Sequence, residues 1–123
     1  MSFLRSAAAF DWIVNARHVF YWGDMDADGL EILDGFRAAG VPAVSLLMDR
    51  GAYDTWERFG TNSDVRGQPL AGRPAKAVPH LRRDEAALYA VLTSVDWPRH
   101  RRVEQERIPL AVAHAALVSQ LAA

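Results

Sequence analysis

The sequence predicts an α/β domain with a parallel sheet. Two short runs rich in β-branched, aromatic and aliphatic residues, at 18–22 and 44–48, flank an amphipathic segment that begins at Asp28 and ends at Gly40. A strand, a helix and a second strand within about 30 residues form a βαβ unit, whose two strands run parallel with a right-handed crossover. The carboxyl ends of both strands then lie at one edge of the sheet, where α/β proteins bind their ligands.

The 123 residues are expected to form one domain, 1–123. Half of them are hydrophobic and 24% are charged, a composition typical of globular proteins. No apolar run approaches the roughly 20 residues that cross a bilayer, and no secretory signal is found, so a cytoplasmic location is expected. Because the chain has no cysteine, a bound metal would have to use carboxylates, histidines, carbonyls or water.

The segments on either side of the βαβ unit have different patterns. Residues 3–15 place apolar side chains at helical spacing, which predicts a helix ahead of the first strand. A short helix is expected at 53–59. The glycine- and proline-rich stretch that follows predicts a mobile loop at 60–80.

Three more elements are expected in the last third of the chain. Apolar residues at helical spacing predict a helix over 84–95. Weak alternation over 102–108 predicts a short edge strand, and Pro109 is suited to be the first residue of a last helix that extends to Leu121.

An acidic turn follows the first strand of the βαβ unit. Asp24 and Asp26 are one residue apart, so a turn at the strand end can direct both carboxylates into one cavity. At about 4 Å and an effective dielectric near 20, their repulsion is about 4 kcal/mol, so a positive charge is expected beside them. Mg²⁺ or Mn²⁺ suits such oxygen ligands, and the third acid, Asp28, is added to the predicted metal ligands.

Three other interpretations of the acidic turn stay open. The acids could cap the following helix and favour its positive end. The turn could belong to a phosphatase-like hydrolase, with Asp24 as the nucleophile and Asp26 as the general acid, or to a non-catalytic interaction remnant whose open sheet edge packs on a partner. A calcium loop of the EF-hand type is disfavoured because its twelfth position, which requires glutamate, is Gly35.

Five further residues are candidates for the same site. Asp49 ends the second strand and is either a third metal ligand or a helix cap. Glu104 and Glu106 could approach the metal, while Arg102 or Arg107 could hold a phosphate through a bidentate guanidinium contact. The alternative for these last four is a solvated edge strand whose charges prevent aggregation.

Three blocks of sequence, at 21–29, 45–49 and 103–108, occur in the order found in a known family. Together they resemble the C-terminal domain of JetD, the nuclease subunit of the Wadjet anti-plasmid systems of bacteria. That domain is similar to the Toprim fold of the topoisomerase VI A subunit, whose Asp-x-Asp-x-x-Gly motif matches Asp24, Asp26 and Gly29. The resemblance implies Mg²⁺-dependent cleavage of DNA, and as partners it implies DNA and SMC-like subunits of the defence complex. A second copy of the chain is also expected as a partner, because an unpaired sheet edge favours dimerisation.

The resemblance has one departure. Toprim nucleases also use a glutamate at the end of an earlier strand, whereas here only one helix is expected ahead of the Asp-x-Asp strand. The N-terminal part of the family's pattern is therefore expected to be missing, and the chain is expected to have little or no nuclease activity by itself.

Overall fold

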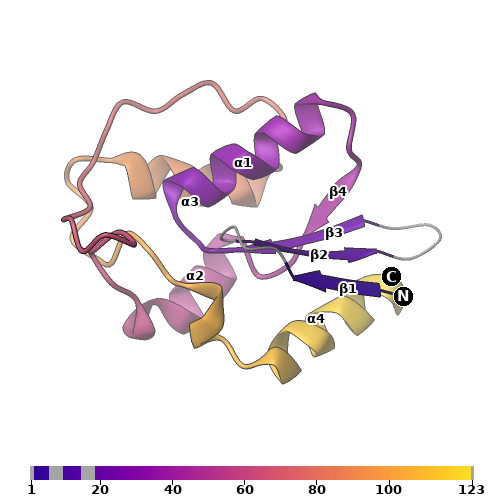
Figure 1. The fold of residues 1–123 in the computed structure, drawn as a ribbon. Coiled ribbons are helices and arrows are strands. Elements are labelled where there is room, and N and C mark those ends of the chain that lie inside the picture. The colour runs from indigo at the N-terminus through magenta and orange to yellow at the C-terminus, as the bar shows by residue number, and fades with distance from the viewer. Residues whose placement is uncertain (1, 6–9, 15–18, 123) are drawn as a thin grey trace.

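A four-stranded sheet forms the centre of the molecule, in the order β1-β2-β3-β4 (Figure 1). The computed structural model describes residues 2–5, 10–14 and 19–122. β1 pairs with β2, and β2 with β3, in antiparallel fashion, while β3 and β4 are parallel. The predicted α/β class is confirmed, but the parallel pairing is confined to the βαβ unit and the sheet is mixed. The strands are β1 (Ser2–Arg5), β2 (Phe10–Val14), β3 (Val19–Gly23) and β4 (Ala43–Ser45).

The helix predicted over 3–15 is wrong where the structure describes that range, because β1 and β2 occupy it. Residues 6–9 and 15 of the predicted helix lie outside the described residues. Short apolar runs do not separate strand from helix by periodicity alone, and 10–14 is aromatic and β-branched. β3 also needs a hydrogen-bonding neighbour on the side opposite β4, and β2 supplies it.

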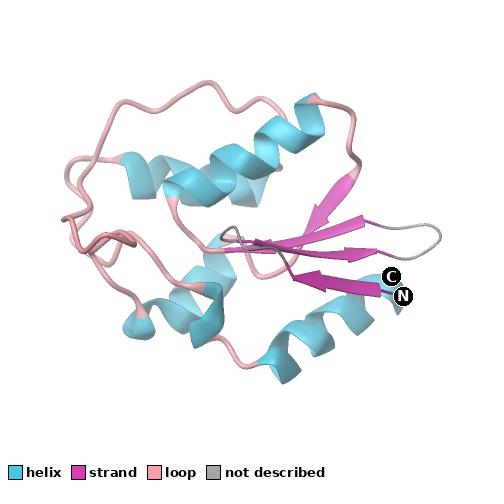
Figure 2. Cartoon of the chain, in the orientation of Figure 1, coloured by secondary structure: helices cyan, strands magenta, loops and turns pink. Residues whose placement is uncertain are grey.

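Helices cover both faces of the sheet (Figure 2). α1 and α3 contact each other on one side of it, and α4 lies on the other side (Figure 1). Within the described ranges, no helix has both the length and the apolar character needed to cross a membrane. The helices are α1 (Ala27–Ala38), α2 (Arg50–Trp56), α3 (Arg83–Thr93) and α4 (Leu110–Ala122), with short 3₁₀ turns η1 (Glu57–Phe59) and η2 (Gln105–Arg107).

The edge strand predicted over 102–108 is reduced to isolated pairings. Val103 forms an antiparallel bridge with Met25, and Arg102 forms one with Thr61, after which the chain turns into η2. The chain therefore pairs with two different neighbours in succession instead of lying along one strand.

The hydrophobic core is built around β3. Phe20, Tyr21 and Trp22 are successive residues and all are buried, as expected for a strand that is covered on both faces. α1 contributes Leu30 and Leu33 to the same core. This packing fixes the carboxyl end of β3, where the acidic turn begins.

A second buried feature lies between α1, β4 and α3. Glu85, which is 2% exposed, accepts two hydrogen bonds from Arg37, of 2.6 and 3.1 Å, and one from the hydroxyl of Ser45. The backbone N–H of Arg82 donates a further bond of 2.7 Å. Burial favours the neutral carboxyl, but the bonds from Arg37 and Ser45 outweigh it and hold the pKa of Glu85 below 4.5.

We expect Glu85→Ala to lower the free energy of unfolding by about 3–5 kcal/mol, because it leaves the guanidinium of Arg37 buried without its partner. Urea unfolding followed by circular dichroism measures this loss. Since the pKa of folded Glu85 is lowered, its contribution is present above pH 4.5 and lost as the pH falls through the folded value. The difference between wild type and variant should therefore shrink in acid.

The matched control is Asp84→Ala, which removes an exposed acid from the same helical turn. It should cost no more than about 1 kcal/mol, the usual value of a charge at a helix end. Equal losses in the two variants would contradict the importance given to the buried pair.

Candidate functional site

The site is assembled from two segments that are distant in the sequence. β3 ends at Gly23, and Asp24 follows it directly. Met25 then pairs with Val103 through two backbone hydrogen bonds of 2.9 and 3.0 Å. This pairing places Arg102 beside the acidic turn, 78 positions away from Asp24 in the sequence.

Asp24 is 2% exposed, and both of its carboxylate oxygens are occupied. Oδ1 accepts a 2.8 Å hydrogen bond from the backbone N–H of Gln105, and Oδ2 accepts a 3.0 Å bond from Nη2 of Arg102. Gln105 is the first residue of η2, so its N–H has no acceptor within that turn. Burial raises the pKa of Asp24, and these two bonds oppose the rise.

Asp26 is the N-cap of α1. Its backbone is extended, and its Oδ1 accepts a 2.6 Å bond from the N–H of Gly29. The helix predicted to begin at Asp28 starts at Ala27 instead, so Asp28 lies in its first turn. Burial, reinforced by the charge of Asp24, raises the pKa of Asp26 to about 7. Its Oδ2 lies 3.6 Å from Nε of Arg102, so one guanidinium faces both carboxylates.

Gly29 allows α1 to approach the end of β3 closely. A Cβ at this position would lie 2.3 Å from the carbonyl oxygen of Asp24, closer than any side chain tolerates. The carbonyl of Gly29 also accepts a 3.0 Å bond from the hydroxyl of Tyr21. The glycine of the Asp-x-Asp-x-x-Gly motif is therefore required by the packing of helix on strand.

A pocket of about 230 Å³ opens beside the two carboxylates. Asp28 stands at this pocket too, but its side chain is 72% exposed and pairs with Arg73 at 2.9 Å. The three predicted metal ligands thus share one cavity, with a loop segment as its far wall. The lining residues are Asp24, Asp26, Asp28, Gly29, Ile32, Asp64, Val65, Leu70 and Arg102.

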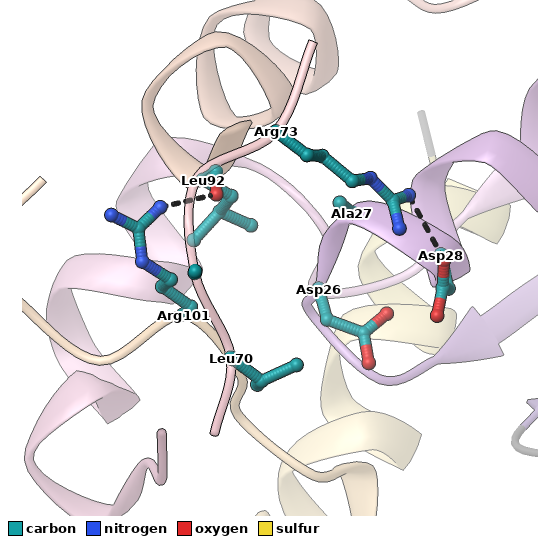
Figure 3. A pocket seen from close by; sticks show the side chains of 8 residues that line it. Asp26, Ala27, Asp28, Leu70, Arg73, Leu92 and Arg101 are labelled. Atoms are coloured by element: carbon teal, nitrogen blue, oxygen red, sulfur yellow. Dashed lines mark hydrogen bonds and ion pairs between the residues drawn. The ribbon is translucent and has the colours of Figure 1, made fainter. Parts of the chain in front are cut away.

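A smaller pocket of about 40 Å³ is also lined by Asp26 (Figure 3). Arg73 reaches across from the loop to Asp28 and also pairs with Glu31 at 2.7 Å. Arg101 points away toward the end of α3, where it donates a 2.9 Å bond to the carbonyl of Leu92 (Figure 3). The loop between η1 and α3 is therefore tied to the first turn of α1 next to the acidic pair.

The structure keeps the remaining predicted site residues out of the pocket. Asp49 is exposed and caps α2, accepting a 2.8 Å bond from the N–H of Ala52, as the capping interpretation expected. Glu104 is half-buried, and Glu106 and Arg107 are exposed. None of these four side chains lines the cavity with Asp24.

Two partners of the acids were not predicted from the sequence. The N–H of Gln105 is a backbone group, so no residue type could reveal it. Arg73 lies in the glycine- and proline-rich stretch, which carries no periodic pattern. Arg102 was singled out as a phosphate ligand, whereas here it holds Asp24.

The donor set is suited to a hard divalent cation. Asp24 and Asp26 line one cavity, and the guanidinium of Arg102 faces both carboxylates. In the described part of the chain, no group of three or more His, Cys, Asp and Glu side chains is arranged around a common metal position. Mg²⁺ often uses only one or two carboxylates, together with water and substrate phosphates. The two aspartates fit that mode.

Comparison with known proteins gives one family. The model described as "Wadjet protein JetD, C-terminal" matches residues 2–117. No curated protein matches the chain. The family match covers the acidic turn, the paired residues Met25 and Val103, and η2.

We expect Asp24→Ala to lower the free energy of unfolding by about 3–5 kcal/mol, since it leaves Arg102 buried without its ion-pair partner. Chemical denaturation monitored by tryptophan fluorescence measures the change. Asp28→Ala removes an acid four positions away whose pair with Arg73 is exposed, and should cost at most about 1 kcal/mol. If Asp24→Ala were as stable as Asp28→Ala, the buried pair would not support the fold.

Proposed function

The chain belongs to the family of Wadjet JetD C-terminal domains, and from this premise we propose that it is a metal-dependent DNA-cleaving domain of a bacterial Wadjet defence system, with a Toprim-like site. The observation that carries the proposal is the convergence of Asp24 and Asp26 on one pocket at the carboxyl end of β3. Ligands of α/β domains are bound at such strand ends.

Asp24 and Asp26 would hold Mg²⁺ or Mn²⁺, with Asp28 at the rim of the same cavity. When bound, the cation would polarise a DNA phosphodiester and stabilise the negative charge that develops during cleavage. Asp24 is oriented for this role by the backbone N–H of Gln105, and Asp26 by its cap on Gly29. The two carboxylates are thus positioned before any ligand arrives.

The first turn of α1 favours a DNA phosphate at the same place. Asp26 starts this helix, and the positive end of the helix dipole points toward the pocket. Arg73 and Lys76, on the loop beside α1, pair with Glu31, and Arg73 also pairs with Asp28 at the rim of the pocket. These groups support DNA as the substrate.

The proposal extends to partners. The family name places the domain in the Wadjet system, so other subunits of that system, including SMC-like ones, are proposed partners together with DNA. A second copy of the chain is proposed as well, because the sheet ends in edge strands β1 and β4, which offer backbone groups for pairing.

The phosphatase alternative gains no support from the geometry. A nucleophilic Asp24 would form a covalent phospho-aspartate, so trapping with a fluoride analogue would discriminate this role from metal binding. The metal titration and the plasmid cleavage assay described next test the alternative of a non-catalytic interaction remnant.

We expect calorimetric titration with Mg²⁺ or Mn²⁺ to detect weak binding to the wild-type chain and none to the Asp24→Asn/Asp26→Asn variant, because the latter lacks both charged ligands. The matched control is Asp49→Asn/Asp84→Asn, which removes two acids outside the pocket. It should bind like wild type, since asparagine also caps helices well. Binding that survives the loss of Asp24 and Asp26 would exclude them as ligands.

We expect little or no cleavage of supercoiled plasmid by this chain alone, because Toprim nucleases also use a glutamate and no glutamate is among the described residues that line the pocket. Gel electrophoresis of plasmid incubated with Mg²⁺ or Mn²⁺ checks this. Robust cleavage that vanishes in folded Asp24→Ala protein would contradict the expected weakness while supporting the metal role. Circular dichroism at the assay temperature establishes that the variant is folded.

A further inference from the structure

The pocket contains a cation of its own, the guanidinium of Arg102. This residue is 6% exposed, and its Nη2 lies 3.0 Å from Oδ2 of Asp24. Its Nε lies 3.6 Å from Oδ2 of Asp26 and has no hydrogen-bond partner, although it is buried. The guanidinium is therefore aimed at the space between the two proposed metal ligands.

The backbone around Arg102 fixes this direction. Val103 is paired with Met25 on one side, and the carbonyl of Arg102 accepts a 2.8 Å bond from the N–H of Thr61 on the other. Because the main chain is held on both sides, the segment that carries Arg102 cannot move away from Asp24. Only rotation of the side chain can take the charge away from the acids.

A divalent cation would require the same oxygens. Mg²⁺ binds carboxylate oxygen at about 2.0–2.1 Å, so an ion on Oδ2 of Asp24 would stand close to the guanidinium. Two cations a few ångströms apart repel each other, and burial of Asp24 and Arg102 reduces the screening by water. The buried Nε already has no hydrogen-bond acceptor, and a bound cation would also neutralise the nearby charge of Asp26.

Resting on the proposed metal function, we propose that Arg102 and the divalent cation compete for Asp24, so that Arg102 takes the place of the metal in the metal-free chain and leaves Asp24 when metal binds. Arg102 then has two effects. It supports the fold before metal arrives, and it lowers the affinity of the site for the ion.

The test is calorimetric titration of Mg²⁺ into Arg102→Gln, which removes the charge and keeps a polar side chain. We expect binding to become tighter by about tenfold or more, because one positive charge leaves the site. Arg102→Lys keeps the charge and should bind close to wild type. Arg107→Gln makes the same charge change at an exposed position outside the pocket and should also leave the affinity unchanged.

A second measurement uses the wild-type chain and does not depend on the stability of Arg102→Gln. The ¹⁵Nε–H resonance of Arg102, assigned by its loss in Arg102→Lys, should shift and exchange faster with water when Mg²⁺ is added. This follows because the side chain leaves its buried position beside Asp24. A resonance that stays in place while Mg²⁺ binds would overturn the competition.

The outcomes separate this inference from the proposed function. Mg²⁺ binding that is equally strong in wild type and Arg102→Gln overturns the competition but leaves the metal site standing. Failure of both proteins to bind Mg²⁺ overturns the metal site and the competition with it. Tighter binding in Arg102→Gln alone supports both.

Discussion

The need to neutralise two neighbouring acids in a buried position shapes this fold more than any other requirement. Asp24 is buried and Asp26 is half-buried where a fully covered strand ends, so water can compensate their charges only in part. The charges are compensated by the guanidinium of Arg102, the backbone N–H of Gln105 and the N–H of Gly29 in the first turn of α1. The bridge between Met25 and Val103 then links the βαβ unit to the C-terminal third.

Much of the fold could be predicted from the sequence. β3, α1, β4, α3 and α4 were predicted within a few residues because each has a strong apolar period or a clear glycine or proline boundary. The N-terminal strands were mistaken for a helix, since four- and five-residue runs are too short for periodicity to decide. Their identity depends on pairing with β3, a tertiary contact that no local pattern contains.

The acidic pair of the candidate site could also be predicted, but its environment could not. A positive charge was expected near Asp24 and Asp26 and was assigned to a metal ion, whereas the structure provides Arg102 as well. The sequence had marked Arg102 as basic without revealing which acid it would meet, because the meeting spans 78 positions. Of the two roles considered for Asp49, the structure shows the helix cap, which a sequence can indicate because capping is a local interaction.

The bridge at Val103 also bears on how genes for such domains should be read. The nine residues at 21–29 contain the complete Asp-x-Asp-x-x-Gly motif. A truncated gene that stopped before codon 102 would still encode it. Its product would nevertheless lack the guanidinium and the amide that make the buried acids tolerable. An intact motif in a genome is therefore insufficient evidence of an intact domain, and the Arg-Val-x-Gln segment at 102–105 is the better criterion of completeness.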